Sequence, residues 1–165
     1  MISVGQNLPQ AMLLRDLDHA EGYYSAYYCL RESYDTSYWV IMKFRGDGPF
    51  LGNTETADRF DIDLSTSDVD GQLHLQLDEH GGQSELSPIP VPINQWFRID
   101  AFYKSTPEAD GRLIVWQDDV QVFDTGQRPT APSSFVSFGV GVAAWRVSPV
   151  PASIWIDDIS VFDVE

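Results

Sequence analysis

Residues 71–80, GQLHLQLDEH, alternate apolar side chains with hydrogen-bonding ones and carry the clearest capacity for chemistry in the sequence. Side chains of a β-strand alternate between its two faces, so Gln72, His74 and Gln76 share the face opposite the leucines. Amide groups donate and accept hydrogen bonds together, and a histidine ring can also act as a general base. The row predicts contact with a polar, uncharged partner, or else a strand face that is merely solvated.

Two further segments, DRFDIDLS and QWFRIDAFYK, alternate polar and apolar side chains in the same way. If these strands lie beside GQLHLQL in one sheet, we expect their polar side chains to form adjacent rows on a single surface. The alternative is an outer sheet facing solvent, with charge pairs across its strands. The predicted surface consists of Arg59, Asp61, Asp63, Gln72, His74, Gln76, Arg98 and Asp100.

Acidic residues near both ends of the chain suggest a structural calcium site. Calcium takes six to eight oxygen ligands, and the first and last strands of a sandwich can meet. Solvated acids would give the same pattern, and the three histidines and one cysteine lack the spacing of a zinc site. The candidate calcium ligands are Asp16, Asp18, Glu21, Asp157 and Asp158.

The charge of the chain restricts its partners. With 25 acidic and 10 basic residues, the 165-residue chain has a formal net charge of −15. This charge argues against nucleic acids and anionic membranes, and it disfavours anionic polysaccharides unless the basic residues cluster. Neutral ligands and cations remain compatible. The single cysteine, Cys29, cannot form an internal disulfide, and its aromatic surroundings predict a small buried apolar side chain.

A period of two runs through almost the whole sequence and predicts the elements that must position these residues. Ten candidate strands are separated by turn-forming residues, and no segment of useful length has helical periodicity. We therefore expect one all-β domain over residues 1–165, a two-sheet antiparallel sandwich or jelly roll. Residues 87–95, SPIPVPINQ, predict an extended connection that crosses between the sheets. The first ten residues, MISVGQNLPQ, lack the basic and apolar regions expected of a signal peptide, and no apolar run is long enough for membrane insertion.

The second half of the chain resembles the concanavalin A-like and laminin-G-like jelly rolls. The resemblance rests on the order INQWFRIDAFYK, GRLIVWQDDVQVFDTG, SFGVGVAA and ASIWIDDISVFD. It covers residues 94–165 well and residues 22–80 by pattern only, and it is closest to the carbohydrate-binding and polysaccharide-lyase members. The family usually has Asp-Gly where this chain has Asp118 and Asp119, so we expect a longer or differently built turn.

This resemblance implies a glycan bound on a concave sheet face, where aromatic rings stack on pyranoses. Trp116 and Trp145 are the favoured tryptophans for stacking, because each adjoins polar residues. We therefore expect a lectin-like, extracellular or cell-surface domain that binds a polysaccharide or glycan, alone or within a larger chain.

Two alternatives to a lectin-like domain remain. One is a polysaccharide lyase acting on a uronate polymer, with His74, Gln72 and Arg98 as its catalytic candidates. The other is a non-catalytic structural or adhesion module of a surface protein. A glycosidase is less expected, because Asp61 and Asp63 lack the glutamates of the related glycosidases.

Overall fold

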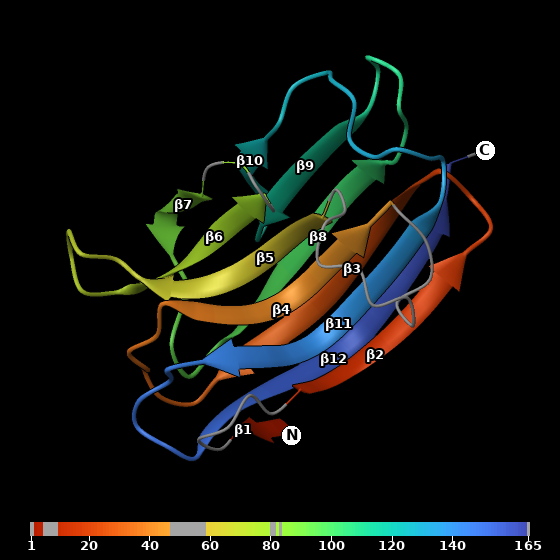
Figure 1. Ribbon diagram of the computed structural model, residues 1–165. Helices are drawn as coiled ribbons and strands as arrows, with labels where there is room; N and C mark the ends of the chain where they lie inside the picture. The colour runs from red at the N-terminus through yellow and green to blue at the C-terminus, as the bar shows by residue number, and fades with distance from the viewer. Residues whose placement is uncertain (1, 5–9, 47–58, 80–81, 83, 165) are drawn as a thin grey trace.

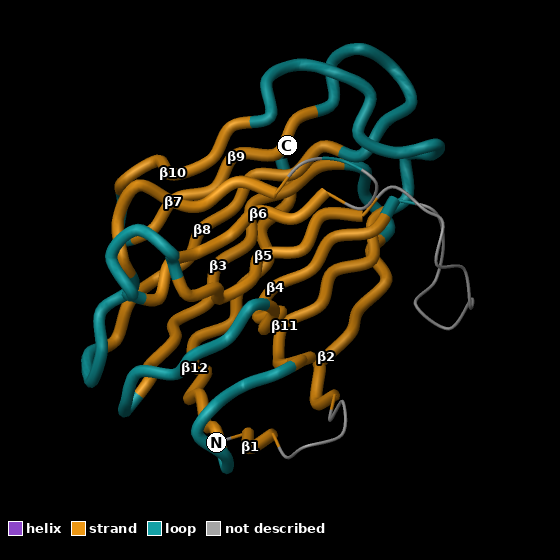
Figure 2. Tube along the Cα trace, turned by 60° about the vertical axis from the view of Figure 1, so that its left-hand side comes forward, coloured by secondary structure: helices purple, strands orange, loops and turns teal. Residues whose placement is uncertain are grey.

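The computed structural model describes residues 2–4, 10–46, 59–79, 82 and 84–164. Two six-stranded antiparallel sheets pack face to face in this part of the chain (Figure 1). Figure 2 shows strands joined by loops, with no helix among the described residues. None of the described segments is therefore a helix that could span a membrane. The predicted two-sheet antiparallel β-sandwich is confirmed.

Twelve strands make up the two sheets in the described residues. Sheet A has the strand order β1-β12-β3-β8-β9-β10, and sheet B has the order β2-β11-β4-β5-β6-β7. In chain order the strands are β1 (Ile2–Val4), β2 (Gln10–Leu17), β3 (Glu21–Leu30), β4 (Tyr38–Arg45), β5 (Arg59–Thr66), β6 (Leu73–Glu79), β7 (Ser84–Pro90), β8 (Trp96–Lys104), β9 (Arg112–Gln117), β10 (Val120–Asp124), β11 (Val136–Trp145) and β12 (Ala152–Asp163).

The proline-rich segment is both a strand and a crossing. Its first residues complete β7, which the sequence did not predict as a strand. Proline lacks the N–H that a central strand must donate, and β7 lies at the edge of sheet B where proline is tolerated. The following residues cross between the sheets, because Val91 donates to Leu73 in sheet B and Asn94 donates to Leu30 in sheet A. The predicted connection is therefore correct for residues 91–95.

The turn between β9 and β10 is a two-residue turn, whereas the sequence predicted a longer or differently built one. Asp118 and Asp119 have φ angles of 48° and 67°, so both residues adopt the left-handed conformation of a two-residue hairpin turn. Aspartate tolerates this conformation better than most residues because its short side chain can hydrogen-bond locally. One Asp118 carboxylate oxygen accepts the backbone N–H of Arg98 at 2.8 Å.

The core lies between the sheets and is built from inward-facing side chains of strands β2 to β12. Leu73, Leu75 and Leu77 of β6 point into it, as the alternation predicted. Tyr24 and Phe138 pack in it with ring centroids 4.7 Å apart. The outer faces of both sheets therefore carry the alternate, mainly polar side chains, on which any site must be built. Cys29 is buried, as predicted.

Candidate functional site

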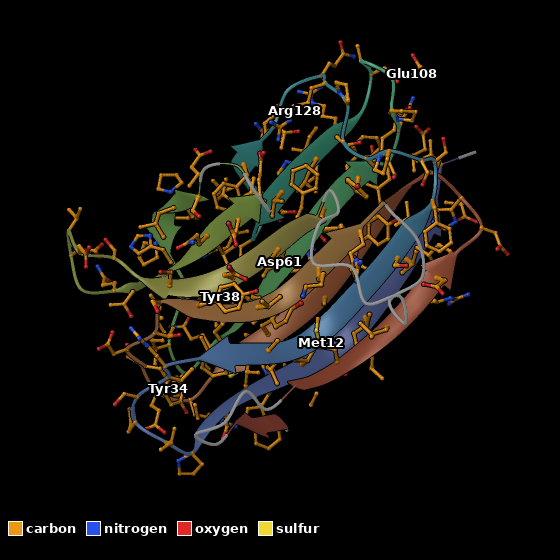
Figure 3. The ribbon with its side chains drawn as sticks, viewed as in Figure 1. Met12, Tyr34, Tyr38, Asp61, Glu108 and Arg128 are labelled. Carbon is orange, nitrogen blue, oxygen red and sulfur yellow. The ribbon has the colours of Figure 1, made fainter. Side chains whose placement is uncertain are left out.

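The outer face of sheet B, here called the polar face, carries the predicted rows of β5 and β6. Strand register places Asp61 between Lys43 on β4 and Asp78 on β6. One step along β5 and β6, Asp63 pairs with Gln76. Sheet B lies in front of sheet A in Figure 1, and Figure 3 shows the side chains of this face from the same side. The sequence correctly predicted that the polar sets of β5 and β6 are adjacent.

Asp61 is the centre of the polar face. The Tyr38 hydroxyl donates to its Oδ2 at 3.1 Å, and the Lys43 ammonium lies 3.6 Å from its Oδ1. Figure 3 shows Tyr38 and Asp61 near each other on neighbouring strands of this sheet. The carboxylate is fully buried, whereas the Lys43 side chain is 13% exposed and Tyr38 is half-buried. Asp61 can therefore fix the two side chains that reach the surface.

Two buried carboxylates on the outward face of a sheet are unusual. Asp61 and Asp63 both have an exposure of 0%, although they point away from the apolar core. Removing a carboxylate from water is expensive, and an ion pair only partly offsets that expense. Buried ion pairs, which contribute little net stability, are often found where they hold side chains in place for binding or chemistry. The burial marks this part of the polar face as the candidate site.

A β-bulge in β4 brings Tyr38 and Lys43 to the same face. Strict alternation would put these residues on opposite faces, since five positions separate them. The register of β4 against β5 shifts between Val40 and Met42, which absorbs one residue and restores both side chains to the polar face. Sequence reasoning missed Tyr38 for this reason, because the apolar run after it showed no sign of a bulge.

His74 lies on the polar face but is held by the chain itself. Its Nδ1 donates to the Ser87 carbonyl oxygen at 2.8 Å, and its Nε2 lies 3.0 Å from a carboxylate oxygen of Asp70. Its strand neighbours are Ser65 and Pro90, and neither belongs to the predicted polar rows. With an exposure of 6%, the ring is positioned to join β6 to the segments beside it.

We expect His74→Ala to reduce stability without changing ligand affinity. The variant removes two hydrogen bonds from a buried site, and each contributes about 1 kcal/mol. Urea unfolding should show a loss of about 2 kcal/mol for His74→Ala, against about 0.5 kcal/mol or less for Gln76→Ala, which is half-buried on the same strand. Equal losses in the two variants would contradict the structural role of His74.

The predicted single surface is wrong for Arg98 and Asp100, and the predicted stacking residue Trp116 lies on the same side of the sandwich as these two. These residues belong to β8 and β9 of sheet A and lie on its outer face, since their neighbours Ile99 and Val115 point into the core. The crossing after β7 separates them from β5 and β6 by the thickness of the sandwich. His74, Gln72 and Arg98 therefore do not come together as one catalytic group.

The remaining predicted binding residues are Gln72, Arg59 and Trp145. Gln72 precedes β6 and is exposed, and its amide donates to Asp70 at 3.3 Å. The side chains of Arg59 and Trp145 lie outside the described part of the structure. Their backbones pair with Arg45 and Tyr38, respectively.

The predicted calcium ligands do not gather in the described part of the structure. Asp16 accepts the Ser137 hydroxyl at 2.5 Å on sheet B, and Glu21 lies 3.4 Å from the Lys104 ammonium. Among the described residues, no three acidic, histidine or cysteine side chains form a metal-binding group. The placement of these acids gives the calcium site no support.

Calcium binding nevertheless stays a prediction that melting can test. An ion that binds only the folded chain raises the melting temperature, and a chelator reverses the rise. A melting temperature that does not change between millimolar calcium and chelator would remove the site.

The sandwich shares the jelly-roll β-sandwich fold of several solved structures, as the sequence pattern suggested. One similar solved structure is a double mutant of an alginate lyase with an alginate trisaccharide, at 14% identity and a TM-score of 0.70, with 93% of this chain and 75% of that chain covered. Another is an endo-β-1,4-glucuronan lyase from the fungus Trichoderma reesei, at 15% identity and a TM-score of 0.65. The alignment covers 96% of this chain and 76% of the lyase chain.

A third similar structure is a tetrameric galectin from the sponge Cinachyrella, at 12% identity and a TM-score of 0.57, with 93% and 100% of the two chains covered. At these identities the likeness establishes the fold alone. No family model and no curated protein sequence matches the chain.

Proposed function

We propose that the chain is a carbohydrate-binding domain that takes a polysaccharide or glycan on its polar face. The observation that carries the proposal is the buried Asp61 carboxylate, which holds Tyr38 and Lys43 at the surface. Because the Tyr38 hydroxyl donates its hydrogen bond to Asp61, the Tyr38 oxygen can accept a hydrogen bond from a sugar hydroxyl. The ammonium of Lys43 is a charged donor with the chemistry to bind sugar oxygens.

The charges of the polar face favour a neutral or weakly charged glycan. Lys43 and Arg45 lie on β4 beside the two buried carboxylates of β5, so the local charges largely cancel. A polyanion would meet Asp61 and Asp63 as well as the basic side chains. A glycan partner also fits an extracellular or cell-surface location, with or without further domains in the parent protein.

A second candidate, a lyase of uronate polymers, is favoured by the meeting of Tyr38 and Lys43 at one carboxylate. In such a reaction a base removes the proton α to the uronate carboxylate. The glycosidic C–O bond at the β position breaks, its oxygen takes a proton, and a C=C bond forms. Tyr38 is placed as the proton-transfer group, and Lys43 can offset the charge of the substrate carboxylate. The alginate and glucuronan lyases among the similar structures act on polymers of this class.

Calorimetric titration of two variants tests the binding proposal. Probes are cellohexaose and mannohexaose as neutral glycans and hexamannuronate as a uronate. We expect Tyr38→Phe to weaken binding about fivefold through the loss of one hydrogen bond, and Lys43→Met about tenfold through the loss of a charged donor. Arg112→Met is the matched control, because Arg112 forms its own ion pair with Asp124 on the opposite sheet.

The same variants separate the two candidate functions. A lyase would raise the ultraviolet absorbance of alginate or glucuronan solutions as unsaturated uronate forms, and Tyr38→Phe would lower that rate by about 10²–10⁴-fold. Binding without a rise in absorbance leaves the lectin-like function. No binding to any probe would contradict both functions and favour a structural or adhesion module.

A further inference from the structure

The outer face of sheet A has an open groove on the side of the sandwich opposite the polar face. Its volume is about 320 Å³. Strands β3, β8, β9 and β12 contribute its walls, together with the turn after β9. Its lining includes Tyr23, Ser25, Asp100, Trp116, Asp119 and Phe162.

Strand register explains one wall of the groove. Phe162, Tyr23 and Phe102 are directly paired across β12, β3 and β8, so three aromatic rings stand in one row. The Tyr23 and Phe102 rings are 5.2 Å apart between centroids. The exposed fractions of Tyr23 and Phe162 are 49% and 59%, which leaves much of their ring surface in water.

The next row along the strands explains the floor and the second wall. This row runs across the same face from β12 to β9 and consists of Ser160, Ser25, Asp100 and Trp116, each paired with the next. The two serine side chains are small and leave space above the sheet between the aromatic row and the Trp116 ring. The groove therefore has aromatic rings on two sides and hydroxyl and carboxylate oxygens between them.

Arg98 fixes the carboxylates of the groove. Its Nε donates to Asp100 at 2.7 Å, and its guanidinium also forms an ion pair with Asp119. Hydrogen bonds with Tyr27 and Asp100 raise the pKa of Arg98, so the guanidinium stays charged. Arg98 thereby holds the Asp100 and Asp119 carboxylates in place as hydrogen-bond acceptors. Its single positive charge offsets one of their two negative charges.

We infer that this groove is a second glycan site, which binds an uncharged oligosaccharide. Aromatic rings offer flat apolar surfaces to the apolar faces of pyranoses, and fixed carboxylates accept hydrogen bonds from sugar hydroxyls. Asp100 and Asp119 repel the carboxylates of a uronate chain, because the single charge of Arg98 offsets only one of their two negative charges. This site is independent of the polar face, which has different residues on the other sheet.

Nuclear magnetic resonance titration of the full chain tests the second site. The reporter is the indole N–H signal of Trp116, assigned with Trp116→Phe. The probes are three neutral hexasaccharides (cellohexaose, laminarihexaose and mannohexaose), hexamannuronate and hexaglucosamine. The variant Tyr23→Ser/Phe162→Ser removes the exposed wall. Trp96→Ser is the matched control, because Trp96 is also 49% exposed on this face but does not line the groove.

At least one neutral hexasaccharide should shift the Trp116 signal, with about tenfold weaker binding to the double variant and a change below about twofold in Trp96→Ser. Tyr38→Phe should leave this response unchanged, so failure of the polar-face site would not remove it. The inference is overturned if no neutral probe shifts the Trp116 signal. A stronger response to hexamannuronate or hexaglucosamine, or equal losses in Trp96→Ser and the double variant, would also overturn it.

Discussion

Asp61→Ala should lower the free energy of unfolding by about 3 kcal/mol, because it removes a buried carboxylate that pairs with the largely buried Lys43 ammonium. The variant also deprives the Tyr38 hydroxyl of its acceptor. Lys43 is 13% exposed and can partly reach water, which places the loss at the lower end for broken buried pairs. Urea unfolding monitored by tryptophan fluorescence measures the change.

Asp78→Ala is the matched control for Asp61→Ala. Asp78 pairs directly with Asp61 across β5 and β6 but is half-buried, and its carboxylate accepts a hydrogen bond from the Ser84 hydroxyl at 3.1 Å. Its removal should change stability by about 1 kcal/mol or less. Similar losses in the two variants would show that Asp61 does not organise the polar face.

Gly141→Ala should destabilise the chain by about 3 kcal/mol or more, since two separate effects oppose the added Cβ. Gly141 has a φ of +152°, a conformation that is nearly restricted to glycine. A Cβ there would lie 2.2 Å from the Ala11 carbonyl oxygen and 2.5 Å from the Met12 Cα of β2. These are backbone atoms, so β2 would have to move away from β11. Thermal and urea unfolding measure the loss.

Gly71→Ala separates the two effects at Gly141. Gly71 has a φ of +69°, and a Cβ added there meets no atom within 4 Å. This variant should therefore show the conformational effect alone, about 1 kcal/mol. If Gly141→Ala is no more destabilising than Gly71→Ala, β2 does not approach β11 as closely as described.

Alternation in the sequence predicted which side chains share a face, and it did so correctly for β5 and β6. It could not predict which strands are neighbours. Asp61 and Asp100 occupy equivalent places in their strands, yet the crossing near Val91 sends them to opposite sides of the sandwich. In β3, alternation predicts that Tyr23 and Tyr24 lie on opposite faces, but it could not predict that Tyr24 is the one that enters the core.

Only some residues of the polar face could be predicted from the sequence. Asp61 and Asp63 were identified from their spacing, but their burial depends on the side chains that surround them in the fold. Tyr38 was not identified, because the bulge that directs it outward leaves no mark in a run of apolar residues. His74 was identified as a ligand contact, whereas its ring nitrogens meet Ser87 and Asp70 of the chain itself.

A crystal structure of the chain with a bound neutral hexasaccharide tests the proposed function most directly. The account predicts sugar density over β4, β5 and β6, with a sugar hydroxyl donating to the Tyr38 oxygen and the Lys43 ammonium in contact with the ligand. Occupation of the sheet A groove alone, or a ligand that touches neither Tyr38 nor Lys43, would contradict glycan binding on the polar face.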